Sequence, residues 1–159
     1  MFKNFFKPKP TNFISPFKGK LMTIEEVPDP VFSEKSMGDG FAIEMHDGNV
    51  YAPCDGEIVV LFPTGHAIGV KSVDRNEYLL HLGLETVNYK GEGFQTFVKV
   101  GDKVKQGDLL VKVDLDFFRT NNVCMVSPII VTNANQRKIK LLKSGEVEAK
   151  EKDILSITA

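Results

Sequence analysis

Short apolar runs broken by turn residues are the feature that most constrains the fold of this chain. From Asn12 onward, runs rich in Val, Ile, Leu and Phe are interrupted roughly every eight to twelve residues by Gly, Pro, Asp or Asn. This rhythm is typical of an all-β, antiparallel sandwich or barrel, including the barrel-sandwich hybrid. The predicted strands are Gly56–Phe62, His66–Ser72, Glu77–Leu82, Leu109–Val113, Ile129–Thr132 and Ile139–Leu142. Helices should be few and short, and the best candidate is Asp114–Asn121, where Asp can start a helix and Asn can end it.

Length and composition set the number of domains. The chain has 159 residues, 42% of them hydrophobic, which is enough for one compact core and too little for two. We expect a single domain over residues 15–159, preceded by a flexible tail over residues 1–14. In that tail, Phe2, Phe5 and Phe6 alternate with lysines before Pro8. The pattern leaves two readings open, a frayed tail or a short basic amphipathic turn that makes weak contact with a membrane.

Charge and cysteine usage exclude several classes of protein. Twenty basic and 21 acidic residues give a net charge of -1, so a nucleic-acid-binding protein is not expected. Cys54 and Cys124 are isolated and far apart, which favours buried free thiols in a reducing compartment. No apolar run approaches the roughly 20 residues of a membrane span, and no secretory signal precedes the domain. A cytoplasmic protein is therefore predicted.

Two histidines, His66 and His81, lie in strongly apolar sequence on either side of a predicted hairpin turn at "VDRN". If the loop has two or four residues, the numbers of two residues that face each other across the hairpin add up to an odd total. His66 then lies opposite or near Gly83, and the side chains of His66 and His81 point to the same face. An odd-length loop would place them on opposite faces. The even-length reading puts Ile68, Val70 and Leu79 on the histidine face, which then forms an apolar recess containing two imidazoles.

Two converging titratable groups in an apolar recess indicate chemistry more than structure. His46, in the turn-like "MHDGN", is expected to be an ordinary hydrogen-bonded residue. Zinc hydrolysis needs three protein ligands, and neither HxxxD nor HxH occurs; a serine triad needs GxSxG, which is also absent. The remaining possibility is that one histidine is a nucleophile and the other stabilises charge, as phosphoryl transfer requires. No metal and no cofactor are predicted.

Several motifs, in order along the chain, carry a family resemblance. They are "GDGFAI" (Gly38–Ile43), "APCDGEI" (Ala52–Ile58), "PTGHAIGV" (Pro63–Val70), "LLHLGLETVNYKGEGF" (Leu79–Phe94), "GDKVKQGDLL" (Gly101–Leu110) and "SPIIVTN" (Ser127–Asn133). Together they resemble the glucose-type IIA component of the bacterial phosphoenolpyruvate-dependent sugar phosphotransferase system. The similarity begins near Ser15 and runs to the C-terminus, and the block that starts at His81 is the most specific part.

The resemblance implies a phosphocarrier with four site residues. His81 would accept a phosphoryl group on Nε2 from the phosphocarrier protein HPr and pass it to a IIB domain of a sugar permease. The carbonyl of Gly83 would hold Nδ1–H of His81, while His66 would stabilise the phosphoryl group and Thr64 would orient His66. This arrangement agrees with the chemistry, because a hydrogen bond on one imidazole nitrogen fixes which nitrogen is the nucleophile.

The resemblance also implies a docking surface. Phe32 and Phe62 would contribute to an apolar rim for partners, and Asp29 would lie near the recess. Glu85 departs from relatives that have Asp at this position, which puts partner preference in doubt. The transported sugar and any regulatory protein targets are not indicated.

One alternative from another class is a lipoyl- or biotinyl-type carrier domain, which "APCDGEIVVL" and "VKVGDKVKQGDLLVKVD" also resemble. Such a carrier needs a lysine in an MKM- or DKA-like setting, and the chain has none.

Overall fold

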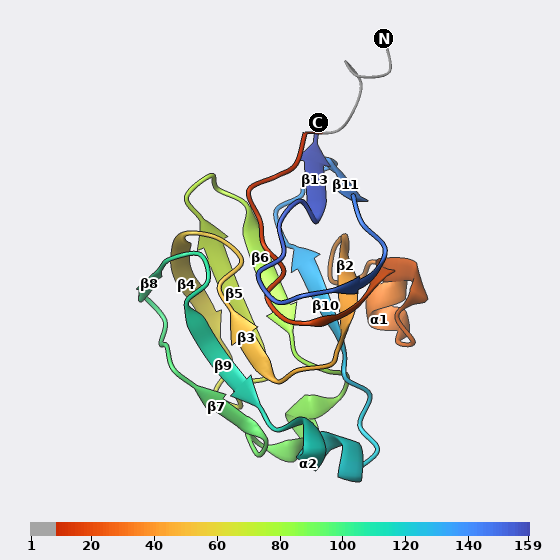
Figure 1. Cartoon of the computed structure of the whole chain (residues 1–159), viewed down its shortest axis with the longest axis vertical. Coiled ribbons are helices and arrows are strands. Elements are labelled where there is room, and N and C mark those ends of the chain that lie inside the picture. Colours follow the sequence, from red (N-terminus) through yellow and green to blue (C-terminus); the bar gives the residue numbers. More distant parts are fainter. Residues whose placement is uncertain (1–8) are drawn as a thin grey trace.

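The computed structural model describes residues 9–159, which form three antiparallel β-sheets and two short α-helices (Figure 1). The large sheet has eight strands in the order β12-β1-β2-β10-β6-β5-β4-β8, the second has the order β3-β9-β7, and β11 pairs with β13. The strands are β1 (Gly19–Thr23), β2 (Gly40–Met45), β3 (Asn49–Tyr51), β4 (Gly56–Leu61), β5 (Ala67–Ser72), β6 (Glu77–His81), β7 (Phe94–Thr96), β8 (Lys103–Val104), β9 (Leu109–Val113), β10 (Val126–Val131), β11 (Lys138–Leu141), β12 (Gly145–Val147) and β13 (Leu155–Thr158). The helices are α1 (Pro30–Ser33) and α2 (Leu115–Thr120), with 3-10 turns η2 (Ile24–Glu26) and η3 (Thr86–Tyr89).

The all-β prediction is confirmed, as are the six predicted strands, which differ from β4, β5, β6, β9, β10 and β11 only at their ends. The predicted helix is α2, and it begins as expected at an aspartate. The Asp114 carboxylate accepts a hydrogen bond from the Phe117 amide at 3.0 Å, which satisfies one of the free amides of the first turn. The helix is short and lies with η3 at the lower end of the molecule in Figure 1.

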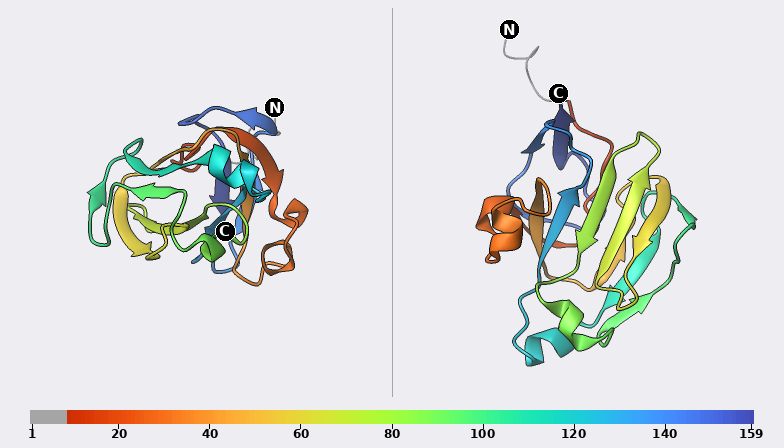
Figure 2. Two further views of the ribbon diagram at one scale, coloured as in Figure 1. Left: turned by 90° about the horizontal axis from the view of Figure 1, so that it is seen from below. Right: turned by 180° about the vertical axis from the view of Figure 1, so that it is seen from behind.

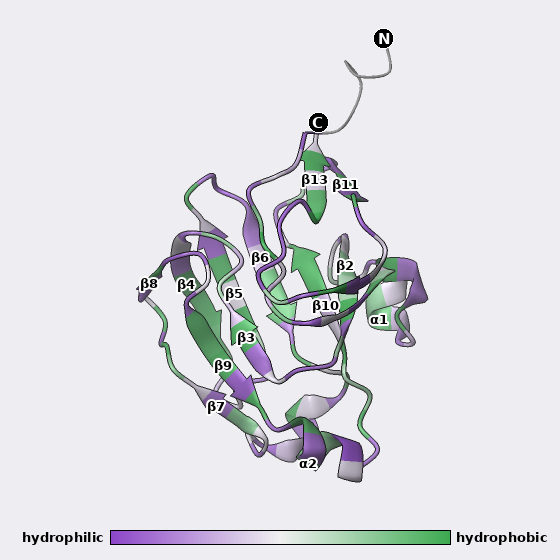
Figure 3. Cartoon of the chain, viewed as in Figure 1, coloured by the Kyte–Doolittle hydropathy of each residue, from purple (hydrophilic) through white to green (hydrophobic). Residues whose placement is uncertain are grey.

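The main core lies between the large sheet and the β3-β9-β7 sheet, which is in front of it in Figure 1 and behind it in the right view of Figure 2. Strands β2, β10 and β6 are apolar on both faces. On β10, Ile129 packs into this core, while Ile130 packs into a smaller apolar cluster on the opposite face, under α1 and η2. Figure 3 accordingly shows β10 as strongly hydrophobic. Because a strand alternates its side chains, this second cluster gives the large sheet a buried outer face, and the site lies there.

The segment before β1 packs onto the C-terminal part of the chain. Thr11 N–H donates to Leu155 O at 2.9 Å, and Phe13 has only 1% of its surface exposed. The boundary of the tail, predicted at residue 14, therefore lies in a segment that packs against the C-terminal part of the chain. The predicted membrane-contacting turn rests on Phe2, Phe5 and Phe6, which lie outside the described residues. Within residues 9–159, no helix is long and apolar enough to cross a membrane.

Candidate active site

The hairpin between the two histidines has a different register from the predicted one. Its loop has three residues, closed by Ser72 N–H donating to Asn76 O at 2.8 Å, and Arg75 in the loop adopts a positive φ of 73°. Ala67 therefore lies opposite His81, and Leu82 N–H donates to His66 O at 2.7 Å. The prediction of an even-length loop, with His66 near Gly83 across the ladder, is wrong.

The corrected register also changes which side chains share a face. Ile68 and Val70 point into the main core with Leu80, so their predicted place on the histidine face is wrong. Leu79 does lie on the histidine face, where it packs against the smaller apolar cluster. His81 follows two residues later on the same strand, so alternation directs its side chain to the same outer face.

The two imidazoles nevertheless meet, as the sequence predicts. Their ring centroids are 5.2 Å apart with the planes at 76°, an edge-to-face arrangement. Strict alternation would send His66 toward the main core, but His66 lies in a bend just before β5 begins. The preceding Gly65 has a φ of +76°, which breaks the extended conformation at this point. The direction of the His66 side chain is thus set by the turn rather than by the strand.

A backbone carbonyl holds one nitrogen of His81. The Nδ1 atom lies 2.7 Å from Gly83 O, two residues further along the chain. This contact requires the chain to fold back directly after β6, and Gly83 makes that possible with a φ of +78°. Because a carbonyl oxygen can only accept, the hydrogen bond places the proton on Nδ1 and leaves a lone pair on Nε2. The hydrogen bond predicted between His81 Nδ1 and the Gly83 carbonyl is therefore present, whereas the role of His81 as phosphoryl acceptor stays a prediction.

His66 has two neighbours besides His81. Thr64 Oγ1 makes a hydrogen bond to His66 Nδ1, and the edge of the His66 ring packs against Phe62 at a centroid distance of 5.1 Å. Only 3% of the His66 surface is exposed, so these contacts lie in a buried position. Thr64 therefore lies where the sequence predicts it.

Burial favours the neutral form of both imidazoles. Burial lowers the pKa of His81 below its ordinary value, although the hydrogen bond to Gly83 and the negative charge of Asp29 act in the opposite direction. Burial also lowers the pKa of His66, and the neighbouring His81 lowers it further. Only a neutral imidazole has a lone pair, so the recess favours the nucleophilic form at neutral pH.

The apolar surroundings of the pair come from two phenylalanines with different burial. Phe32, on α1, packs edge-on against His81 at 5.0 Å and is only 5% exposed, as part of the smaller apolar cluster. Phe62 is 42% exposed and borders His66 at the surface. Of the two predicted rim residues, Phe62 thus faces solvent, whereas Phe32 forms a wall under the site.

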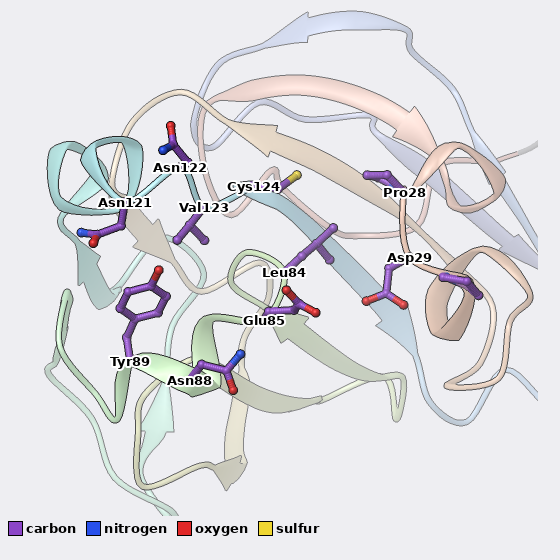
Figure 4. Close-up of a pocket in the computed structure, with 11 residues that line it drawn as sticks. Pro28, Asp29, Leu84, Glu85, Asn88, Tyr89, Asn121, Asn122, Val123 and Cys124 are labelled. Atoms are coloured by element: carbon purple, nitrogen blue, oxygen red, sulfur yellow. The ribbon is translucent and has the colours of Figure 1, made fainter.

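A polar groove of about 890 Å³ is lined by residues that neighbour the recess along the chain, such as Leu84, which follows Gly83 (Figure 4). Its lining residues are Pro28, Asp29, Pro30, Leu84, Glu85, Asn88, Tyr89, Asn121, Asn122, Val123 and Cys124. The carboxylates of Asp29 and Glu85 come from different segments and stand on separate walls (Figure 4). Asp29 is fixed as the N-cap of α1, where it accepts a hydrogen bond from the Val31 amide at 3.0 Å. The groove thus carries two carboxylates, and the charge of Asp29 also acts on His81.

Other chemistries find less support in the described residues. Within residues 9–159, no three His, Cys, Asp or Glu side chains are grouped so that they could hold a metal ion. The predicted absence of a metal stays a prediction. His46 follows directly after β2 and is paired with Glu146 at 3.2 Å, as expected for an ordinary hydrogen-bonded residue.

Comparison with known proteins decides the family. The model of the phosphoenolpyruvate-dependent sugar phosphotransferase system family EIIA 1 matches residues 11–137. The chain belongs to this family. It is thus a phosphotransferase component, and the lipoyl- or biotinyl-type alternative is not favoured.

Relatives of the EIIA family agree with this assignment. The glucose-specific EIIA component of Halalkalibacterium halodurans is 49% identical over 144 residues, which cover 90% of this chain and 83% of the relative. The glucose-specific EIICBA component of Staphylococcus carnosus is also 49% identical, over 89% of this chain, but this chain spans only 21% of its length. The solved structure of glucose permease IIA from Mycoplasma capricolum has a TM-score of 0.85 and 39% identity, covering 94% of this chain and 97% of that one.

Two buried hydroxyls near the site were not predicted from the sequence. Ser127 Oγ accepts a hydrogen bond from Gly83 N–H at 2.9 Å, and Thr86 Oγ1 donates to Leu82 O at 2.7 Å. Both residues lie within the motifs that carry the family resemblance. Nothing local in the sequence marks their role, because Ser127 reaches the loop from β10, 44 residues away.

Proposed function

We propose that His81 is the phosphoryl acceptor of this EIIA-family chain, with Nε2 as the reacting atom. The observation that carries the proposal is the hydrogen bond between His81 Nδ1 and Gly83 O, because it directs the lone pair to Nε2. The Nε2 lone pair attacks the phosphorus of a phosphohistidine on HPr. As the new N–P bond forms, the old one breaks, and its electron pair stays on the donor imidazole.

His66 serves as the neighbouring stabiliser. Its ring lies 5.2 Å from that of His81, so a phosphoryl group on His81 can contact it directly. Thr64 orients the His66 ring through the hydrogen bond to Nδ1. A donor aimed at oxygens that gain charge during transfer contributes more in a water-poor recess than in solvent.

The acceptor of the phosphoryl group is a IIB domain of a sugar permease. Support comes from relatives in which an EIIA region is one part of a longer component, such as the glucose-specific EIICBA component of Staphylococcus carnosus. Glucose is the sugar that the names of several relatives suggest. Residues 15–159 would form the single functional domain. A cytoplasmic location and weak membrane contact through the N-terminal tail stay predictions from the sequence, which does not indicate whether regulatory proteins are among the targets.

The test is a phosphoryl chase with labelled phosphoenolpyruvate, enzyme I, HPr and a IIB domain. His81→Ala should take up no label, because the nucleophile is gone. His66→Ala should accept label but deliver it to IIB about 10²- to 10³-fold more slowly, the usual effect of losing one stabilising donor. His46→Ala is the control and should change neither step. Label on His81→Ala, or wild-type delivery by His66→Ala, would refute the assigned roles.

A further inference from the structure

The loop after β6 contains Gly83, whose backbone conformation must be fixed by contacts with other residues. Gly83 supplies the carbonyl that holds His81, and its positive φ of +78° suits glycine. Glycine also adopts many other backbone conformations at little cost, so Gly83 alone cannot keep its carbonyl in place. Some other contacts must fix the two peptide groups on either side of its Cα atom.

The peptide between Leu82 and Gly83 is held at both ends by buried hydroxyls. Its carbonyl accepts a hydrogen bond from Thr86 Oγ1 at 2.7 Å, and its N–H donates to Ser127 Oγ at 2.9 Å. The Ser127 hydroxyl donates its own proton to Met125 O at 3.0 Å, so its acceptor lone pairs face the loop. Thr86 and Ser127 are both fully buried, and water cannot easily replace either contact.

The next peptide, between Gly83 and Leu84, carries the functional contact. Its N–H donates to Cys124 O at 2.9 Å, and its carbonyl accepts from His81 Nδ1 at 2.7 Å. All four polar groups of the two peptides are therefore bonded. The Gly83–Leu84 peptide has one backbone partner, Cys124 O, whereas both bonds of the Leu82–Gly83 peptide come from the Thr86 and Ser127 hydroxyls. The orientation of the first peptide plane, and with it φ of Gly83, therefore depends on the two hydroxyls.

We propose that Ser127 and Thr86 are positioning residues that hold the Gly83 carbonyl against His81 and so keep the lone pair on Nε2. The proposal rests on His81 being the phosphoryl acceptor. Without the Ser127 hydroxyl, the Gly83 N–H loses its buried acceptor and the first peptide can rotate. The carbonyl then leaves Nδ1, and His81 populates the tautomer with its proton on Nε2, which cannot attack phosphorus.

The experiment compares three serine variants by two readouts. Nitrogen-15 NMR of the unphosphorylated protein measures the fraction of His81 with its proton on Nδ1, and a separate assay measures the rate of phosphoryl acceptance from phospho-HPr. Ser127→Ala should give a mixture of tautomers and accept phosphate about 10- to 100-fold more slowly, the range seen when groups that orient metal-binding histidines are removed. Ser127→Thr keeps the hydroxyl and should restore both values.

The matched control is Ser15→Ala. Ser15 is also fully buried and also bonds a backbone group, donating to Phe17 O at 2.7 Å, but it lies in the segment before β1. This variant loses a comparable hydrogen bond and should leave the tautomer and the rate unchanged. If Ser127→Ala does not fold, Thr86→Val removes the other hydroxyl without changing side-chain shape and should give the same two effects.

Specific results would overturn the proposal. They are a folded Ser127→Ala protein in which His81 keeps Nδ1–H alone, a tautomer change without a slower rate, or a Ser127→Thr protein that is not restored. Failure of the proposed function looks different, because a wild-type protein that is never phosphorylated on His81 would still show the tautomer shift in Ser127→Ala.

Discussion

Replacing Gly83 by alanine tests the geometry of the site through stability. A Cβ atom built on Gly83 would lie 2.6 Å from Thr86 Cγ2 and 2.8 Å from Met125 Sδ, well inside ordinary contact distance. The left-handed conformation, with φ at +78°, adds a second cost, since an L-residue is disfavoured there by about 1–2 kcal/mol. Overpacking a buried position typically costs about 1–3 kcal/mol. Together, Gly83→Ala should lower the free energy of unfolding by about 2–5 kcal/mol.

Gly145 offers a control that separates the two costs. Its φ is also +78°, but a Cβ atom there meets no heavy atom within 4 Å. Gly145→Ala should therefore lose only the conformational part, about 1–2 kcal/mol. The difference between the two variants measures the overpacking at Gly83.

Urea denaturation followed by circular dichroism gives both free energies of unfolding. The reasoning fails if Gly83→Ala is less stable than Gly145→Ala by under about 0.5 kcal/mol, which is within the usual error of such comparisons. A second measurement links stability to function. Gly83→Ala should also slow phosphoryl acceptance from HPr, because relief of the clash moves the carbonyl that holds His81, whereas Gly145→Ala should accept phosphate at the wild-type rate.

Three further predictions concern thiols, docking and pH. Cys54 is buried, which raises the pKa of its thiol to about 12, whereas Cys124 is exposed, so a thiol reagent should titrate one cysteine in the native protein and both after unfolding. Phe62→Ala should raise the KM for HPr with little change in unfolding free energy, whereas Phe32→Ala should cost about 3 kcal/mol in urea denaturation, because Phe32 alone is buried. Burial holds the folded-state pKa of His81 below its ordinary 6.5, so the unfolded chain binds more protons as pH falls. The contribution of His81 to stability should be complete above pH 6.5 and decline below it, as denaturation midpoints across this range will show; a flat profile would contradict this.

The strands and the helix could be predicted because their signals are local. The apolar alternation of a strand and the turn residues that end it lie within a few positions of each other in the sequence. The aspartate that caps α2 likewise lies next to the helix that it starts. The hairpin register could not be predicted in the same way. The register depends on a loop of three residues in which Arg75 adopts a φ of 73°. An arginine in the sequence does not indicate a positive φ, because few residues other than glycine adopt one.

The meeting of the two histidines was predicted correctly from a wrong register. The error did not matter because His66 precedes β5, where Gly65 turns the chain and alternation no longer applies. The buried hydroxyls of Ser127 and Thr86, in contrast, could not be predicted from the sequence. Ser127 and Gly83 are brought together only by the pairing of β10 with β6, and a contact between such distant positions leaves no local pattern in one sequence.

The two histidines differ in what their hydrogen-bond partners permit, and this difference separates their roles. The partner of His81 is a carbonyl, which only accepts, so His81 must present a lone pair on Nε2. The partner of His66 is the Thr64 hydroxyl, which can donate or accept. When that hydroxyl donates to Nδ1, the proton of His66 lies on Nε2, and the ring becomes a hydrogen-bond donor. Because burial lowers the pKa of both rings and so favours their neutral form, the proposed transfer would place the phosphoryl group between a fixed nucleophile, His81, and an adjustable donor, His66. Under the proposed function, the pair would thus provide one phosphoryl acceptor instead of two competing ones.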